Sequence, residues 1–518
     1  MKRWAKWGWT MGLAGVALLG GTAGFSAELY SNGVGGGPWT EPASWRGKAV
    51  PGTGDVVVVA TGDTIVFDGN CTNRTACCQI MIDPQAALTF KADNAPHRLS
   101  VGGSIEAYGI LRMDGTKAGE QGSMELSLAG KTENDRVIRL QRGAALFTYG
   151  ADRLIDGCRN VRITTSASAP GGNIFIIPET MADISRATLS NIVVHAHGVD
   201  NTGFKPTERL NIIANQFVGV ARIVLWGCDT PMIRNNHFQY GGATPAVSLD
   251  ACKLGQVQNN IFSGAYGSAA FFLRDTDSSF TGNTVVQANQ GIHWHHGANA
   301  MIKGNVFDDC NCSAYFINVR GVMEDSTVRG SNTLIAINES TLQLTNYRLV
   351  EPRPTNTVMT LELSSMTLLN CNIKPEQIKL GQPPPDGEPW VQALAYLVVQ
   401  VKGNRPPSAE ITVRTAAASG GPPAGAADMN VRNSPARLGA DGCTSLPRTL
   451  RPLIVRTWSI GFGGVKKDPP FYDLMVSVPG VKAGDPSQVA KTQVVEPKSD
   501  WDRPEPNKAV PTFEVTLP

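Results

Sequence analysis

Short apolar and polar segments alternate between residues 209 and 318 in a pattern that repeats every 21 to 24 residues. Five asparagines mark the repeat in the segments ANQF, NNHF, NNIF, GNTV and GNVF; they are Asn215, Asn236, Asn260, Asn283 and Asn305, separated by 21, 24, 23 and 22 residues. Each repeat has two β-type segments and no helical period, as one coil of a parallel β-helix requires. A leucine-rich repeat has a similar period, but its leucine-spaced consensus is missing. We therefore predict an all-β chain whose centre is a right-handed parallel β-helix, a solenoid, with the asparagines stacked in a ladder about 4.8 Å apart.

The second β-type segment of each coil predicts an inner and an outer surface. The segments ARIVLW, PAVSLD, AAFFLR, GIHWHH and SAYFIN align between residues 221 and 318. Because side chains alternate along a strand, one set should point inward: Ile223 and Leu225, Val247 and Leu249, Phe271 and Leu273, Ile292 and Trp294, Tyr315 and Ile317. The other set should form two outward columns: Val224, Ser248, Phe272, His293 and Phe316; and Trp226, Asp250, Arg274, His295 and Asn318.

The outward columns carry the candidate chemistry of the chain. Arginine can fork onto a carboxylate, histidine can move protons near neutral pH, and aromatic faces can stack on sugar rings. We assign catalytic roles to Asp250, Arg274, His293 and His295, and substrate-binding roles to Trp226, Ser248, Phe272, Phe316 and Asn318. The alternative is structural: Asp250 and Arg274 form a cross-strand ion pair, and the histidines are ordinary surface residues.

The columns match known enzyme and metal-site patterns only in part. Polygalacturonase-like enzymes place paired carboxylates before a Gly-His-Gly turn, and this chain has neither that order nor that spacing. Calcium-dependent lyase chemistry could use Asp229, Asp250, Asp275 and Asp277, with Arg274 or Lys253 as the base. His293 and His295 share a face but give only two ligands, and transition-metal sites need three or four. The sequence thus predicts no metal centre and leaves calcium open as a cofactor.

Two cysteines have the spacing of the coils. Cys228 lies two residues after Trp226, and Cys252 lies two residues after Asp250; Trp226 and Asp250 are neighbours in the second outward column. They should stack on neighbouring coils with Cα atoms about 5 Å apart, within the range of a disulfide. We predict a Cys228–Cys252 bond.

The beginning of the chain has the order of a secretory signal peptide over residues 1–27. Lys2, Arg3 and Lys6 precede a short apolar run and then a stretch of small residues. The run is shorter than the roughly 20 residues that span a bilayer, and no later segment is apolar enough to do so. With a net charge of +2 and no basic stripe, a nucleic-acid partner is not expected. The mature protein should be extracellular, on the cell surface or in the periplasm.

Residues 37–116 are turn-rich and contain evenly spaced short strands. Trp45, the VPGTGD run at 50–55, the paired valine strands and the LSVGG and GILRMDG segments resemble a G8 domain. That resemblance implies a glycine-rich, all-β unit beside a parallel β-helix in an extracellular protein, as in the cell-migration-inducing hyaluronidase family. It implies location and architecture more than chemistry.

The repeat signal ends near residue 350. Coils should fill residues 117–350, followed by a proline-rich linker or cap at 351–390 and a β-sandwich-like region at 391–518. This last region could bind carbohydrate or cover the end of the solenoid. Taken together, the sequence indicates a secreted β-helix protein that binds or processes extracellular polysaccharide along an exposed sheet, as a lyase or hydrolase if it is an enzyme. The alternative is a noncatalytic structural or adhesive protein of the cell surface or matrix.

Overall fold

The structure is a computed structural model. It describes residues 27–71, 79–155, 157–165, 171–200, 203–204, 209–264, 269–330, 333–350, 359–382, 391–403, 409–415, 431–438, 444, 453–461, 466–467, 472–477, 492–495 and 512–516. Apart from its last residue, the predicted signal peptide lies outside these residues, and so does much of the predicted linker.

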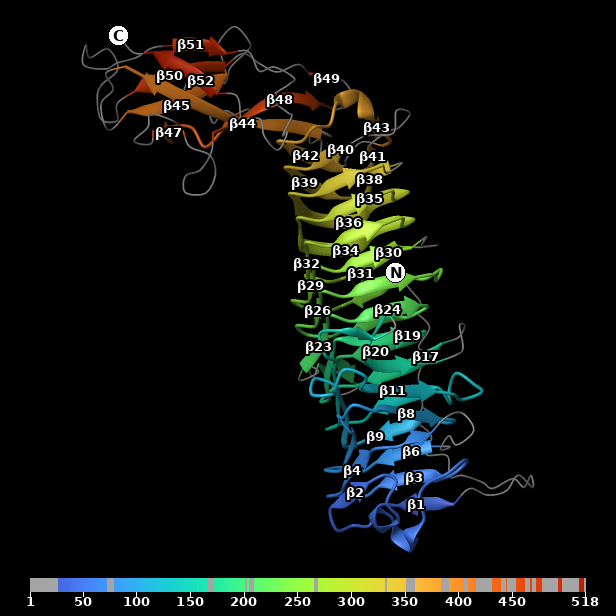
Figure 1. Cartoon of the computed structure of the whole chain (residues 1–518). Helices are drawn as coiled ribbons and strands as arrows, with labels where there is room; N and C mark the ends of the chain where they lie inside the picture. The colour runs from blue at the N-terminus through green and yellow to red at the C-terminus, as the bar shows by residue number, and fades with distance from the viewer. Residues whose placement is uncertain are drawn as a thin grey trace.

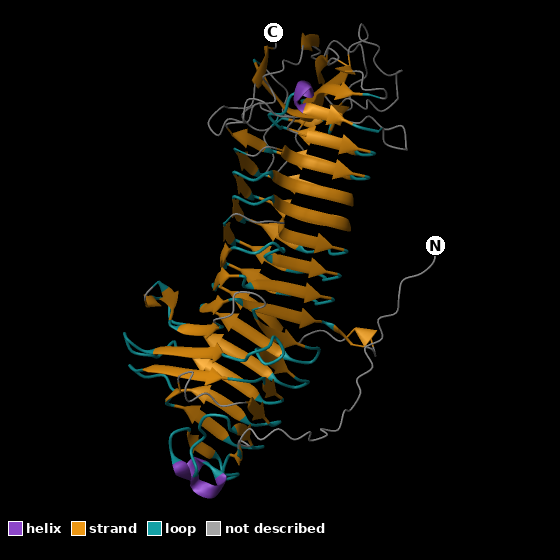
Figure 2. Ribbon diagram, turned by 90° about the vertical axis from the view of Figure 1, so that its right-hand side faces the viewer, coloured by secondary structure: helices purple, strands orange, loops and turns teal. Residues whose placement is uncertain are grey.

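The chain winds into a long parallel β-helix with three sheets along its length (Figure 1; Figure 2). Each coil contributes a strand to face 1, then to face 2, then to face 3, and every strand pairs in parallel with the matching strand of the next coil. The all-β, parallel β-helix fold predicted from the repeat is therefore confirmed.

Face 1 contains β1 (Glu28–Tyr30), β3 (Val56–Val59), β6 (Gln79–Ile82), β9 (Ile105–Ala107), β12 (Val137–Leu140), β17 (Gly172–Ile176), β20 (Ile192–His197), β25 (Arg222–Trp226), β28 (Val247–Asp250), β31 (Ala269–Arg274), the first parts of β34 (Gln290–Lys303) and β36 (Cys312–Glu324), then β38 (Thr333–Asn338), β41 (Met359–Glu362) and β43 (Ile378–Leu380). Face 2 contains β2 (Gly36–Pro38), β4 (Thr64–Phe67), β7 (Ala87–Phe90), β10 (Ile110–Asp114), β13 (Ala145–Tyr149), β18 (Met181–Ser185), β23 (Arg209–Ile213), β26 (Met232–Arg234), β29 (Gln256–Gln258), β32 (Ser279–Thr281), the last parts of β34 and β36, then β39 (Thr341–Thr345), β42 (Ser365–Leu369) and the start of β44 (Val391–Lys402).

Face 3 contains β5 (Asn70–Cys71), β8 (Pro96–Val101), β11 (Ser123–Leu128), β16 (Val161–Thr164), β19 (Ala187–Ser190), β24 (Gln216–Gly219), β27 (His237–Tyr240), β30 (Ile261–Ser263), β33 (Thr284–Val286), β35 (Val306–Asp308), β37 (Thr327–Arg329) and β40 (Arg348–Val350). Two short hairpins leave the coils: β14 (Leu154–Ile155) with β15 (Cys158–Arg159), and β21 (Val199–Asp200) with β22 (Gly203–Phe204).

The interior is one continuous apolar column, because in-register stacking places like residues above one another. Phe217, Phe238 and Phe262 come from successive coils, are all buried, and stack with ring centroids 4.5 and 4.4 Å apart. At Gly297, where β34 turns from face 1 to face 2, a Cβ atom would collide with Nε1 of the buried Trp294. The core thus fixes both the stacking of the coils and the glycine at this corner.

The five predicted asparagines form a hydrogen-bonded ladder at the corner between faces 2 and 3. Each Nδ2 donates to Oδ1 of the next asparagine, over 3.1, 3.0, 2.9 and 3.1 Å from Asn215 to Asn305. Nδ2 of Asn260 also donates to the Ile233 carbonyl oxygen, while Oδ1 of Asn260 accepts from the backbone N–H of Asn236. All five side chains are buried. The ladder therefore satisfies polar backbone groups that the corner would otherwise leave unpaired.

The predicted faces hold for four of the five aligned segments but are wrong for the last. Trp294 pairs with Phe316 and His293 with Tyr315. Phe316 is consequently buried and Tyr315 half-buried on the outer side, the reverse of the prediction. Residues 314–317 are all apolar or aromatic, so alternation alone could not choose the face. Packing chooses it, because Phe316 has no hydroxyl group to leave unpaired in the core.

Cys228 and Cys252 are free, so the predicted disulfide is absent from the structure. They do stack on neighbouring coils, and both are fully buried. Parallel strands in register point equivalent side chains the same way, so the two thiols lie side by side and interact by a hydrogen bond instead of a covalent bond. The Sγ atoms also lie 3.6 and 3.5 Å from the carbonyl oxygens of Trp226 and Asp250, respectively.

Both ends of the solenoid are covered by apolar side chains. At the N-terminal end, beside the 3-10 helices η1 (Pro42–Ser44) and η2 (Arg46–Lys48), Trp39 and Trp45 are buried with ring centroids 5.1 Å apart. Near the other end, η3 (Pro375–Gln377) precedes β43, and Trp458 and Ile460 pack on the last coils. Covered ends prevent edge-to-edge growth of the stack.

The C-terminal region grows directly out of the solenoid. β44 begins as the last rung of face 2 and then pairs with β48 (Leu453–Ile460) and β52 (Thr512–Thr516) to one side of the shaft (Figure 1). This sheet also contains β46 (Val431–Arg432) and β49 (Lys466–Lys467). A second, antiparallel sheet has the order β47 (Ala436–Arg437), β45 (Glu410–Thr415), β50 (Tyr472–Ser477) and β51 (Thr492–Val495). Residues from β44, β45 and β48 share one buried cluster, so the two sheets form a sandwich-like layer pair.

Candidate functional site

The outward side chains of face 1 form two parallel rows, which we call the histidine face. From β17 to β36 the first row contains Phe175, His195, Val224, Ser248, Phe272, His293 and Tyr315. From β20 to β36 the second row contains His197, Trp226, Asp250, Arg274, His295 and Ile317. Neighbouring members of a row are about 4.8 Å apart, the spacing of paired strands.

Most of the residues assigned from the sequence lie together on this face. Trp226, Ser248, Asp250, Phe272, Arg274, His293 and His295 occupy the predicted rows. Two predicted binding residues do not: Phe316 is in the core, and Asn318 lies at the corner after the strand, with φ of 52°. Tyr315 and Ile317 take their places.

Three residues of the histidine face were missed by the sequence repeat. Phe175, His195 and His197 precede the first ladder asparagine, where the coils are interrupted by the β21–β22 hairpin. The alternation in the segment IVVHAH at 192–197 was the available signal, because it points both histidines to one side.

Aromatic and imidazole rings contact one another along the rows. Phe175 stacks on His195 with centroids 4.7 Å apart, and His197 meets Trp226 edge-on at 5.9 Å. Farther along, His293 lies between Phe272 at 5.2 Å and Tyr315 at 5.0 Å. The rings therefore form two groups, one at Phe175, His195, His197 and Trp226 and one at Phe272, His293 and Tyr315, and Val224, Ser248, Asp250 and Arg274 lie between them.

The ion pair between Arg274 and Asp250 lies in the middle of the second row. Nε of Arg274 donates to Oδ1 of Asp250 over 2.9 Å, and Nη2 donates to Oδ2. The hydrogen bond to Asp250 raises the pKa of Arg274. Asp250 therefore engages one edge of the guanidinium group and balances its charge.

Burial keeps the histidines of this face neutral. It lowers the pKa of His197, His293 and His295, with the neighbouring His295 adding to the shift of His293. For His195, burial and then the charge of Arg222 lower the pKa from 6.5 to about 4. Its Nε2 is 3.1 Å from Oδ1 of Asn173. With neutral imidazoles and a balanced ion pair, the two rows carry no net charge near neutral pH.

The low pKa of His195 predicts a loss of stability in acid. The unfolded chain takes up this proton near pH 6.5 and the folded chain only near pH 4. Between these values the unfolded state binds more protons, so the free energy of unfolding decreases as the pH falls. We expect the His195 ring signals in an NMR titration to shift with a midpoint near pH 4. The melting temperature of His195→Gln, which keeps a donor for Asn173, should fall less than that of the wild type over the same pH range. A midpoint near 6.5 would contradict this.

The acidic residues considered for calcium are not gathered at one point. Asp277 accepts from the backbone N–H of Leu254 over 2.6 Å, Asp275 lies in a turn with φ of 48°, and Asp250 is held by Arg274. Within the described ranges, no group of three or more His, Cys, Asp or Glu side chains is placed to hold a metal ion. The same residues contain no helix long and apolar enough to cross a membrane.

The fold defines a parallel β-helix protein. Residues 154–307 match the family model "Right handed beta helix region". No curated protein matches the chain. Among solved structures, it is similar to a mutant tailspike protein of E. coli bacteriophage HK620 in complex with a hexasaccharide, at 9% identity, with 82% of this chain and 87% of that chain covered and a TM-score of 0.21. A complex of the same tailspike with a pentasaccharide gives the same identity and coverage and a TM-score of 0.19.

Proposed function

We propose that this chain is a secreted protein that binds extracellular polysaccharide along the histidine face. The observation that carries the proposal is Trp226, a large apolar side chain that is 41% exposed between His197 and Asp250 in the second row. Isolated exposed apolar residues need no explanation, but one that contacts another ring and lies beside polar groups suits a binding site. Extended glycans suit such a surface, because sugar rings have apolar faces and hydroxyl edges.

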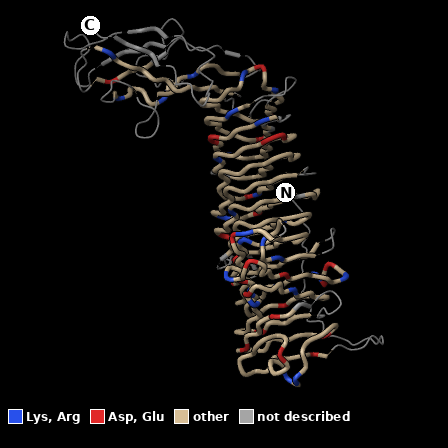
Figure 3. Tube along the Cα trace, viewed as in Figure 1, with Lys and Arg blue, Asp and Glu red and all other residues tan. Residues whose placement is uncertain are grey.

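The charge of the face favours neutral sugars over acidic ones. Arg274 is paired, and lowered pKa values keep the histidines uncharged. The two rows therefore carry no unbalanced positive charge that would attract a uronate. Figure 3 shows no long stripe of one sign along this part of the shaft.

Binding has more support here than catalysis. Both carboxylate oxygens of Asp250 accept hydrogen bonds from Arg274, which leaves Asp250 poorly placed to take a proton from a substrate. Lyase or hydrolase chemistry with Asp250, Arg274, His293 and His295 stays a prediction, as does the use of calcium. The structural or adhesive role is the alternative, and it requires that the face bind no glycan.

The extracellular location is part of the proposal. It is supported by the signal-peptide pattern at residues 1–27 and by the G8-like segment at 37–116, whose family occurs beside β-helices outside the cell. The buried Trp39–Trp45 pair lies in this segment.

Retention on immobilised neutral and acidic polysaccharides tests the binding function. We expect Trp226→Ala to weaken binding of the retained glycan about 10-fold or more, as for an aromatic residue at the centre of an interface. Ile261→Ala is the matched control, because Ile261 is 47% exposed but lies on face 3. Reducing ends and unsaturated products measured on the same panel report hydrolysis and lyase activity. Failure to retain any glycan would overturn the proposal and leave the structural role.

A further inference from the structure

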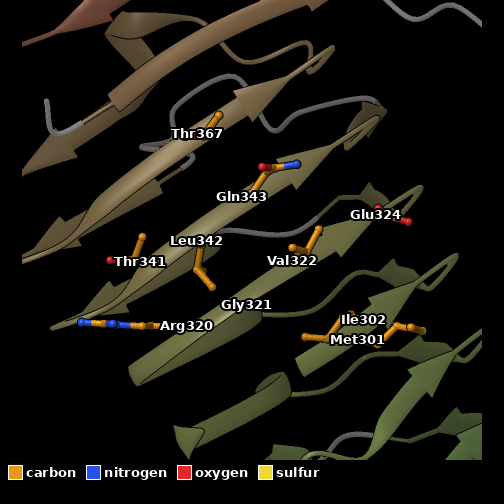
Figure 4. Close-up of a pocket in the computed structure, with 10 residues that line it drawn as sticks. All are labelled: Met301, Ile302, Arg320, Gly321, Val322, Glu324, Thr341, Leu342, Gln343 and Thr367. Atoms are coloured by element: carbon orange, nitrogen blue, oxygen red, sulfur yellow. The ribbon is translucent and has the colours of Figure 1, made fainter. Parts of the chain in front are cut away.

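An open groove lies on face 2, separate from the histidine face. It has a volume of about 570 Å³ and is formed by β34, β36, β39 and β42 (Figure 4). Its outward residues belong to strands that are paired on both sides, so no free strand edge is present in it. The groove is thus a side-chain surface, not a place where a peptide could add as a strand.

One row of the groove changes from apolar to polar along the solenoid axis. Met301, Val322, Gln343 and Thr367 are in register on successive coils. Met301 and Val322 are 58% and 38% exposed, which is unusual for apolar residues on neighbouring strands. Four strands extend about 14 Å, long enough for a short oligosaccharide. An apolar strip continued by an amide and a hydroxyl suits a sugar ring followed by hydroxyl groups.

The two edges of the groove differ in charge. At one edge Arg320 is exposed, and no hydrogen bond or ion pair joins its side chain to another residue in the described part of the chain (Figure 4). At the opposite edge Lys303 is held 3.1 Å from Glu324 and 3.5 Å from Asp325. Lys303 pairs with two carboxylates, so that edge keeps one net negative charge, whereas Arg320 has no ion-pair partner among the described residues.

We propose that this groove is a second glycan site, and that Arg320 binds the carboxylate of a uronic acid residue in it. A guanidinium group can donate two parallel hydrogen bonds to a carboxylate, and the exposed guanidinium of Arg320 has no partner among the described residues that would compete for them. The sugar ring lies over Met301 and Val322, while Gln343 and Thr367 meet its hydroxyl groups. This site depends on the proposed function only in that both sites bind glycans. Its residues and its sheet are different, and it takes acidic sugars where the histidine face takes neutral ones.

Calorimetric titration of the full chain tests this site with two probes: an oligogalacturonate, and the same oligosaccharide after its carboxyl groups are reduced to alcohols. Because the histidine face is proposed to take neutral sugars, the two probes are compared in a Trp226→Ala background, in which we expect the acidic probe to bind at least about 10-fold more tightly than the reduced one. Arg320→Gln should remove that preference, since one charge-assisted pair is worth about 1.5–3 kcal/mol, which corresponds to roughly 10-fold or more. The reduced probe should bind Arg320→Gln and wild type alike.

Two control variants separate this proposal from the first. Arg348→Gln removes an arginine from face 3, and Trp226→Ala disrupts the histidine face. Both should bind the acidic probe as the wild type does. Equal binding of the acidic probe by Arg320→Gln and wild type would overturn the site, as would equal affinity of Trp226→Ala for the two probes. A loss in Trp226→Ala but not in Arg320→Gln would assign acidic sugars to the histidine face. Complete displacement of the probe by a polyglutamate peptide would show an acidic-peptide site instead.

Discussion

Asn260→Ala is expected to lower the free energy of unfolding by about 3–5 kcal/mol. The Asn260 side chain sits in the middle of the ladder, fully buried. Its Oδ1 accepts from the backbone N–H and the Nδ2 of Asn236, and its Nδ2 donates to Ile233 and Asn283. Alanine leaves these partners buried without water, and each unsatisfied group costs about 1–3 kcal/mol. Urea denaturation followed by circular dichroism would measure the change.

The control for this substitution is Gln258→Ala, two residues earlier on β29. Gln258 is half-buried and points outward from face 2. Its loss should change the free energy of unfolding by less than about 0.5 kcal/mol. Because coils contact only their neighbours, limited proteolysis of Asn260→Ala should cut first near the coils that flank β29. Equal stability of the two variants would mean that the ladder stabilises the corner no more than ordinary surface contacts do.

The repeat made the central coils predictable from the sequence. A ladder asparagine recurs once per coil, and an in-register stack requires the same residue at the same corner, so the spacing from Asn215 to Asn305 determined the register of the neighbouring strands. Once the register was known, strand alternation placed Trp226, Asp250, Arg274 and His295 in one row. The Asp250–Arg274 pair, first considered as a structural alternative, follows directly from their adjacency.

Features that depend on side-chain contact across coils could not be predicted in this way. His195 and His197 lie before Asn215 in the same coil, and the β21–β22 hairpin separates their strand from that asparagine, so the regular spacing did not reach them. Spacing placed Cys228 and Cys252 on neighbouring coils, but it does not distinguish a covalent bond from the thiol contact that the structure shows. The face 2 groove lies just after a change of register between Ala298 and Ala300, where β34 and β36 turn from face 1 to face 2. No repeat in the sequence signals that shift.

The segment SAYFIN gives the sharpest test of register on the histidine face. In the structure Phe316 is fully buried in the core, while Tyr315 lies in the outer row with its ring 5.0 Å from that of His293. Phe316→Ala should therefore cost about 3–5 kcal/mol of stability, the usual range for removing a buried phenylalanine. Tyr315→Ala should cost less than about 1 kcal/mol. Chemical denaturation of the two variants would measure this difference.

Glycan binding should respond in the opposite order. Tyr315→Ala removes a ring from the binding surface and should weaken retention of a neutral polysaccharide about 5-fold or more, a change of roughly 1 kcal/mol. Phe316→Leu fills most of the core site, keeps the chain folded, and should bind as the wild type does, because residue 316 does not reach the surface. The opposite result is that Phe316→Leu loses binding, while Tyr315→Ala still binds the glycan but is strongly destabilised. That result would mean that the face has the register first predicted from the sequence. Substitutions at residues 315 and 316 thus separate the packing of the coil that contains β36 from its contact with sugar.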